Sequence, residues 1–253
     1  FLVARYSRDV LARSKIGGLV INKESVGNAR FNRTFAVDTT LALTRSFTIN
    51  SFLAKTSTPG LVDGDLAFYG RAAFRNSRWN IYGQYMDLQD NFNAEVGFVP
   101  HIGIRRSKLH AQWNPRPGKW GVRSMDPMMN IEYTTDQNNR LLSRRIHHMI
   151  GFQFEDGSSF TLITNKVFEQ LDVPFDITDD VTIPVGTYRF WSPSVRYNSD
   201  PSQRVSISAS FSMPRLTPRR STAARNASVT MKKRTVIQGP CADESKTSWY
   251  EYT

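Results

Sequence analysis

The sequence contains almost no cysteine and no long apolar run. Cys241 is the only cysteine among the 253 residues, so an intrachain disulfide and a cysteine-based metal site are excluded. No apolar run approaches the length of about 18 residues that indicates a membrane-spanning helix. Residues 1–6 lack a starting Met and a signal peptide and resemble a strand already in progress. We therefore expect the sequence to be a piece of a longer chain.

Motifs that carry catalysis or bind metals are also absent. The sequence has no His-Glu-x-x-His, no Gly-x-Ser-x-Gly and no phosphate-cradling glycine loop. His147 and His148 are neighbours on a predicted strand, so their side chains point to opposite faces and do not share one metal ion. We expect no cofactor, no metal and no catalysis in this segment.

The positive charge is uneven along the chain. Residues 214–253 contain 8 Lys and Arg against 3 Asp and Glu, a net charge of +5 out of +11 for the whole chain. No helix-turn-helix, zinc-finger spacing or aromatic RNA-binding signature accompanies these basic residues, so a nucleic-acid partner is not expected. Alternation of apolar and polar residues stops after Met213. We predict a basic tail at 214–253 that is disordered or non-native.

Strict alternation dominates residues 1–213. Two adjoining runs at 65–76 and 78–88 alternate apolar and polar residues around a short polar turn, which predicts an antiparallel hairpin. The same reading gives about a dozen strands near residues 1–11, 14–23, 33–43, 46–57, 65–76, 78–88, 103–113, 121–134, 140–155, 158–169, 186–198 and 203–213. The predicted fold class is all-β, an antiparallel up-and-down meander.

Strand length and aromatic placement favour a transmembrane β-barrel. Most runs are longer than the five or six residues usual in globular proteins and match the roughly 9–11 residues that cross a bilayer at a tilt. Aromatic residues lie mainly toward the predicted strand ends, as interfacial girdles do: Phe68, Phe74, Trp79, Tyr85, Trp113, Tyr133, Tyr188 and Trp191. The other interpretation is that they form the core of a soluble β-domain. We predict one barrel domain at 1–213, an incomplete fragment of a full barrel.

One predicted strand carries a basic row. Arg106, Lys108, His110 and Gln112 alternate on a single face, opposite Leu109, Ala111 and Trp113. If the Trp113 face meets lipid, the basic row lines the interior and favours anions. The alternative, which we favour, is that acidic residues on adjacent strands neutralise the row.

Two long connections interrupt the strands, at about 89–102 and 170–185. The first holds a plug or gate candidate made of Asn91, Phe92, Asn93, Glu95, Gly97, Phe98 and His101. Its apolar members, with Val96 and Val99, are costly to leave in water, so we expect the loop to fold back onto the sheet or into the barrel mouth. The second loop contains Asp172, Asp176, Asp179 and Asp180 without a calcium-binding spacing, and we expect a solvated acidic loop.

These loops also carry a family resemblance. The segment Asn91-Phe92-Asn93-Ala94-Glu95-Val96-Gly97-Phe98-Val99-Pro100-His101 resembles the NFNPEVGFVPR signature of a bacterial outer-membrane barrel domain of unknown function, number 5916. Shorter matching pieces lie at 14–19, 32–38, 52–60 and 183–188, so the resemblance covers about residues 1–213. Ala94 stands where Pro is usual and His101 where Arg is usual.

The resemblance implies an outer-membrane barrel of a Gram-negative bacterium, linked in its family to a family-9-like carbohydrate-binding module. It implies no reaction. Outer-membrane lipid and a saccharide are therefore the expected partners, and binding or passage of a saccharide or other surface ligand is the expected function. A soluble β-rich binding module of a secreted protein is the alternative, and a hydrolase-associated domain that uses the acidic loop is a third hypothesis.

Overall fold

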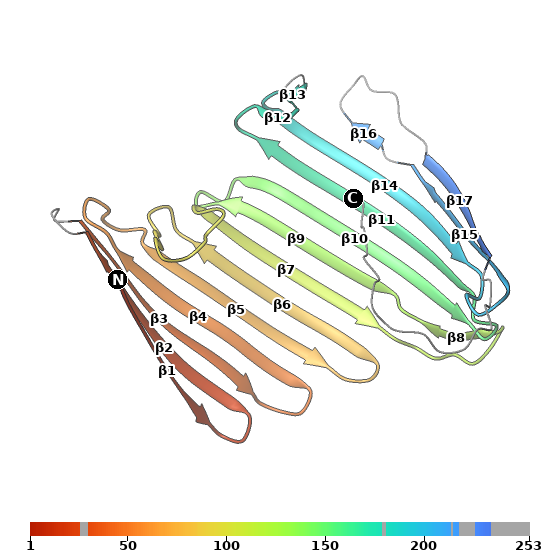
Figure 1. Ribbon diagram of the computed structural model, residues 1–253, viewed down its shortest axis with the longest axis horizontal. Helices are drawn as coiled ribbons and strands as arrows, with labels where there is room; N and C mark the ends of the chain where they lie inside the picture. Colours follow the sequence, from red (N-terminus) through yellow and green to blue (C-terminus); the bar gives the residue numbers. More distant parts are fainter. Residues whose placement is uncertain (26–29, 179–180, 214, 218–225, 234–253) are drawn as a thin grey trace, which may run out of the picture.

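The chain forms one large antiparallel sheet whose strands follow one another in sequence order (Figure 1). The computed structural model describes residues 1–25, 30–178, 181–213, 215–217 and 226–233. The main strands are β1 (Leu2–Val10), β2 (Ser14–Glu24), β3 (Phe31–Ala42), β4 (Phe47–Ser57), β5 (Leu66–Arg75), β6 (Trp79–Leu88), β7 (Ile104–Trp113), β8 (Val122–Met125), β9 (Met128–Asp136), β10 (Leu141–Phe154), β11 (Ser159–Leu171), β14 (Gly186–Asn198) and β15 (Val205–Ser212). The predicted antiparallel meander is confirmed.

The strand predicted at 121–134 is interrupted. It forms two strands, β8 and β9, which both pair with β10 on either side of Asp126 and Pro127. Proline has no amide hydrogen to donate to a ladder, so the pairing breaks where Pro127 stands. Opposite this break lies Gly151, where a Cβ would collide with the Asp126 carboxylate. Gly151 therefore leaves the space that the Asp126 side chain occupies at the break.

Two segments that we did not predict as strands contain short ones. Within the second long loop, β12 (Phe175–Thr178) and β13 (Val181–Ile183) form a separate two-stranded sheet. In the tail, β16 (Arg215–Thr217) pairs with β14, and β17 (Asn226–Lys233) pairs with β15. Much of the predicted 214–253 tail lies outside the described residues, and its disorder stays a prediction.

The two ends of the sheet differ in their connections. The loops at 58–65, 89–103 and 172–185 lie together at one end, at the top of Figure 1. Tight turns at 11–13, 43–46, 76–78 and 155–158 lie at the opposite end, together with the longer connection at 114–121. We refer to these as the long-loop end and the turn end.

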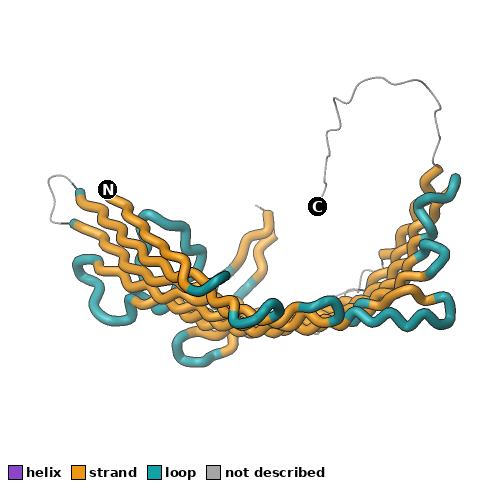
Figure 2. The backbone as a smooth tube through the Cα atoms, turned by 90° about the horizontal axis from the view of Figure 1, so that it is seen from below, coloured by secondary structure: helices purple, strands orange, loops and turns teal. Residues whose placement is uncertain are grey.

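Viewed end-on in Figure 2, the sheet curves into an open trough. The loop between β6 and β7 and the hairpin β12–β13 rise on its concave side (Figures 1 and 2). In the described residues β1 and β17 are the two edge strands and do not pair with each other, so the sheet is not closed. No helix in this part of the chain is long and apolar enough to cross a membrane.

The two faces of the trough have opposite compositions. Residues paired across the ladders share a face, and the face that packs against the loop at 89–103 holds mostly polar side chains. The convex face carries large apolar side chains that stay exposed, among them Ile16, Val20, Phe35, Val37, Leu53, Phe68, Phe74, Leu109, Trp113, Leu162, Val195 and Phe211. In the described residues the buried apolar cluster is small: Ala54, Ala67, Leu88, Phe92 and Ile104.

Candidate functional site

The basic row lies on the concave face of β7. Its charges meet Glu132 of the adjacent strand β9: Arg106 Nε lies 3.5 Å and Lys108 Nζ lies 2.9 Å from the two carboxylate oxygens of Glu132. The three side chains are only about one third exposed. One carboxylate thus offsets part of the row, in the way that cross-strand acidic partners were expected to act.

His110 belongs to a polar network rather than to a metal site. It is buried, its Nδ1 lies 2.6 Å from Asn130 Oδ1, and its Nε2 lies 3.2 Å from Asn80 Nδ2. Its ring stacks on Tyr82 at 4.7 Å between centroids, and the Arg71 guanidinium carbon lies 4.2 Å from the centroid of the Tyr82 ring. Both ring nitrogens of His110 therefore have a polar partner, and the contacts form one polar network that extends from β5 to β9.

Gln112 completes the row at the turn end. Its amide nitrogen donates to Asn114 Oδ1 at 3.1 Å, so it is engaged at the start of the connection that follows β7. The four predicted residues share a face, yet their neighbours differ. Arg106 and Lys108 lie beside a carboxylate. His110 is buried among amide groups and an aromatic ring, and Gln112 forms a local hydrogen bond. The row is therefore not a uniform cationic surface.

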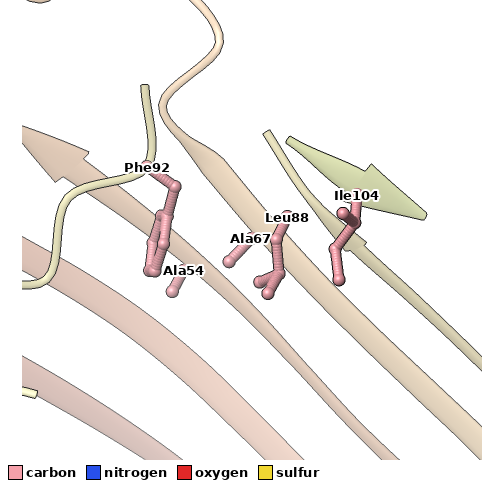
Figure 3. Close-up of a cluster of buried hydrophobic side chains, with 5 residues drawn as sticks. All are labelled: Ala54, Ala67, Leu88, Phe92 and Ile104. Atoms are coloured by element: carbon pink, nitrogen blue, oxygen red, sulfur yellow. The ribbon is translucent and has the colours of Figure 1, made fainter. Parts of the chain in front are cut away.

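The loop at 89–103 is anchored to the concave face by one aromatic side chain. Phe92 is 6% exposed, and its ring lies over Ala54 at one end of a buried cluster that continues through Ala67, Leu88 and Ile104 of the neighbouring strands (Figure 3). The two alanines leave room for the ring. Burying a phenylalanine is favourable by about 1.5–3 kcal/mol. The expected fold-back of the loop is thus confirmed at Phe92.

Polar contacts fix the loop beside this anchor. The Asn91 side chain donates to Asp63 O at 2.9 Å, and Thr56 Oγ1 accepts from Asn93 N at 3.0 Å. Asn32, which is buried on β3, donates to Asn93 O at 2.7 Å. These bonds satisfy backbone groups that the loop would otherwise leave unpaired against the sheet.

Glu95 fastens the loop to β2 through Lys23, whose Nζ lies 2.7 Å from Glu95 Oε2. The hydrogen bond from Lys23 holds the pKa of the Glu95 carboxyl below its usual value, because the ammonium stabilises the ionised form. Lys23 was not among the residues singled out from the sequence. Alternation along β2 predicts the face of the sheet on which Lys23 lies, but only the pairing of the strands places Lys23 beside the loop.

In the second half of the loop, Val99 packs against the same cluster, but Phe98 does not. After a turn in which Gly97 N donates to Ala94 O, Phe98 is 90% exposed. The expectation that Phe98 packs back is wrong, because the small apolar surface of the sheet is already covered by Phe92. Phe98 and His101 instead border a cavity of about 450 Å³, lined also by Phe52, Met86, Phe92 and Arg106.

A glycine allows the chain to leave this loop. Gly103 has φ +70°, a backbone region that side-chain-bearing residues rarely adopt, and a Cβ there would collide with the Asp90 carboxylate. The chain can therefore turn sharply from the loop into β7. As a result Arg106, near the start of β7, lies at the same cavity as His101. The structure thus joins the basic row and the plug loop, which the sequence presented as two separate candidates.

The second long loop is tied to the turn between β9 and β10, which also lies at the long-loop end. Arg140 donates from both terminal nitrogens to Asp172, at 2.9 and 2.6 Å, and from Nε to Asp136 at 3.0 Å. The hydrogen bonds from Arg140 lower the pKa of the Asp172 carboxyl. Asp179 and Asp180, two of the four acidic residues of this loop, lie outside the described residues, and the hydrolase hypothesis stays a prediction.

The described residues contain no group of three or more His, Cys, Asp or Glu side chains that could hold a metal ion. His147 points to the concave face, where Nδ1 lies 2.6 Å from Asn165 Oδ1, whereas His148 points to the convex face. No family model matches the chain, and no curated protein matches it.

Proposed function

We propose that this chain forms part of the wall of a β-barrel in the outer membrane of a Gram-negative bacterium. The observation that carries the proposal is the inverted arrangement of the sheet. Large apolar side chains line its convex face and remain exposed, while polar side chains line its concave face. A membrane barrel needs this arrangement, because its outer surface meets lipid and its interior meets water.

Aromatic residues on the convex face support this assignment. Trp79 and Trp113 lie at the turn end, where their rings stack at 5.7 Å, and Tyr85 and Tyr133 lie nearer the long-loop end. Trp79 and Tyr85 are six positions apart on β6, a span of about 20 Å at roughly 3.3 Å per residue. Two aromatic belts flanking an apolar band of about 25 Å are typical of such barrels. Tyr188 does not join them, because its register with Glu169 places it on the concave face.

The concave face is then the lumen. Amide, hydroxyl and guanidinium groups line it in rows, and these groups hydrogen-bond ligands rich in hydroxyl groups. We propose that it binds or passes a saccharide or another surface ligand without catalysis, with the loop at 89–103 narrowing the passage as a plug or gate. The long-loop end faces the cell exterior, as in bacterial barrels generally. The resemblance to the outer-membrane barrel domain family is part of this proposal.

The competing function is a soluble β-rich binding module. A soluble sheet has to cover its apolar face with a second layer. In the described residues the convex face has no such layer, and the hairpin β12–β13 and the loop at 89–103 lie on the opposite side (Figure 2). The geometry therefore favours the membrane assignment over the soluble one.

Fluorescence quenching by brominated lipid tests the assignment of the two faces. We start from a background in which all five tryptophans are replaced by phenylalanine. Tyr85→Trp then places a probe on the convex face of β6, and Gln84→Trp places a matched probe one residue away on the concave face. We expect brominated chains to quench the first probe strongly and the second one weakly.

Equal quenching of the two probes would contradict the proposal. A chain that stays monomeric and rich in β-structure in buffer without detergent or lipid would favour the soluble module. For the ligand, a neutral oligosaccharide should reduce the ion current through the chain in planar bilayers. An unaffected current would remove the saccharide from the proposal.

A further inference from the structure

Three basic residues form a compact group on the convex face at the long-loop end. They come from three neighbouring strands: Arg144 on β10, Lys166 on β11 and Arg189 on β14. Arg144, Phe168 and Arg189 are paired in one register row, and Lys166 lies two residues from Phe168 on the same face. We call these three residues the outer cation cluster.

The register keeps the cluster small. Neighbouring strands are about 4.8 Å apart, so the Cα atoms of Arg144 and Arg189 are separated by about 10 Å. All three side chains are exposed, and the Arg189 guanidinium lies 5.8 Å from the Phe168 ring centroid. Long basic side chains across this span can converge on one anionic group.

Two members of the cluster, Arg144 and Lys166, differ from other basic residues at the same end. On the other side of the sheet each outward cation has a carboxylate: Arg33 pairs with Glu24 at 3.4 Å, Lys55 with Asp65 at 3.4 Å, and Arg105 with Asp87 at 3.2 Å. Around Arg144 and Lys166, the outward register positions are held by Tyr133, Ile146, Thr164, Phe168 and Trp191, none of which is acidic. Arg144 and Lys166 form no ion pair among the described residues.

The position of the cluster along the strands indicates which kind of anionic group it would meet. Toward the middle of the strands the same face continues mainly into apolar side chains, Ile146, Ile150, Leu162 and Trp191, with His148 and Thr164 between them. In the other direction the strands end in the loops. A group bound here therefore lies at the border between an apolar layer and water, which is where lipid headgroups lie.

We propose that the outer cation cluster binds the phosphate of an anionic lipid headgroup in the leaflet at the long-loop end. This inference rests on the proposed function, because it requires the convex face to meet lipid. Guanidinium groups match phosphate oxygens in geometry and charge, and a lysine adds a third donor. The cluster therefore selects phosphate-bearing lipids for the protein surface beside β10, β11 and β14.

Vesicle partitioning tests the proposal with the full chain. The wild type and the triple variant Arg144→Gln, Lys166→Gln, Arg189→Gln are refolded with three kinds of vesicle: pure phosphatidylcholine, phosphatidylcholine with phosphatidic acid, and phosphatidylcholine with the same fraction of oleate. Flotation measures the partition coefficient. We expect a larger partition coefficient of the wild type for phosphatidic acid vesicles than for the other two kinds. In the variant the ratio of these partition coefficients should fall roughly tenfold, because each basic residue near an anionic surface contributes to binding.

A matched control separates this site from general charge attraction. The triple variant Arg33→Gln, Lys55→Gln, Arg105→Gln removes the same net charge from paired cations at the same end, and it should keep the wild-type preference. Lys166→Gln alone, a single exposed change, covers the case in which the triple variant does not fold, and it should lose part of the preference.

The outcomes distinguish the two proposals. Equal losses in the cluster and control variants, an unchanged preference in the cluster variant, or equal partitioning of the wild type into oleate and phosphatidic acid vesicles would overturn the cluster alone. Failure of the wild type to insert into phosphatidylcholine vesicles would overturn the proposed function itself, and the cluster with it.

Discussion

On the convex face of β7, Leu109 is 44% exposed and Trp113 is 43% exposed, whereas His110, adjacent to Leu109, is 7% exposed on the concave face. The same contrast runs along most strands of the sheet. In a water-soluble domain the apolar face would be the buried one. Here the polar face is the more enclosed, and it also receives the loop at 89–103. This contrast is the basis of the proposal that the two faces meet two different solvents.

The largest expected effect in a test of this difference between the faces comes from placing a charge on the convex face. Leu109→Arg, in the middle of β7, should lower the free energy of unfolding in lipid by about 2–4 kcal/mol, the cost of a charge at the middle of a barrel's lipid face. Urea titration of the chain refolded in bilayers measures the change.

Gln84→Arg is the control for this substitution, because it introduces the same side chain on the concave face of the adjacent strand. Because Gln84 lies opposite Arg71 and Lys108, repulsion between like charges should lower the free energy of unfolding by about 1 kcal/mol, less than the effect of Leu109→Arg. Equal effects of the two substitutions would show that the faces do not meet different solvents.

A second prediction concerns the anchor that covers the concave face. Phe92→Ala should destabilise the attachment of the loop by about 2–3 kcal/mol, somewhat below the usual cost of a buried phenylalanine because the apolar cluster is small. The measurement is hydrogen exchange at the Asn93 amide, which donates to Thr56 Oγ1. Phe98→Ala, at a side chain that is 90% exposed, should leave that exchange rate unchanged. Faster exchange in both variants would contradict the contrast between the anchored Phe92 and the exposed Phe98.

The charge balance of the concave face gives a third test. Glu132→Gln removes the carboxylate that lies beside both Arg106 and Lys108 and should lower the free energy of unfolding by about 1 kcal/mol. If the chain conducts, anion preference should increase in planar bilayers, because two cations lose their counter-charge. In a double-mutant cycle with Lys108→Gln the two losses should not add. Additive losses would mean that the ion pair contributes nothing.

The smallest predicted effect is a pH dependence at the long-loop end. Because the pKa of Asp172 is lowered in the folded state, the Arg140–Asp172 pair stabilises the fold fully above the ordinary aspartate pKa of about 4. This contribution is lost as the pH falls through the lowered pKa. Wild type and Asp172→Asn should therefore differ in unfolding free energy at neutral pH and converge in acid. A difference that persists in acid would contradict the pairing.

Alternation along the sequence determined the secondary structure and the composition of each face. A strand repeats every two residues, so Leu109 and His110 must point apart whatever surrounds them. For this reason the strands at 65–76 and 78–88, and their neighbours, could be placed within a few residues. The loop at 89–103 could also be recognised, because its apolar residues stand outside any strand pattern.

Only the tertiary structure decided which residues meet across strands. Glu132 could not be assigned to Arg106 and Lys108 from the sequence, because a shift in register by one residue would turn it to the other face. The tertiary structure also separated Phe92 from Phe98, since one small apolar surface accommodates one ring, and it brought Arg144, Lys166 and Arg189 together from three strands. Alternation along a strand determines the face on which a side chain lies. The neighbours of that side chain depend on the hydrogen-bond register between strands and on the curvature of the sheet, which no local sequence pattern encodes.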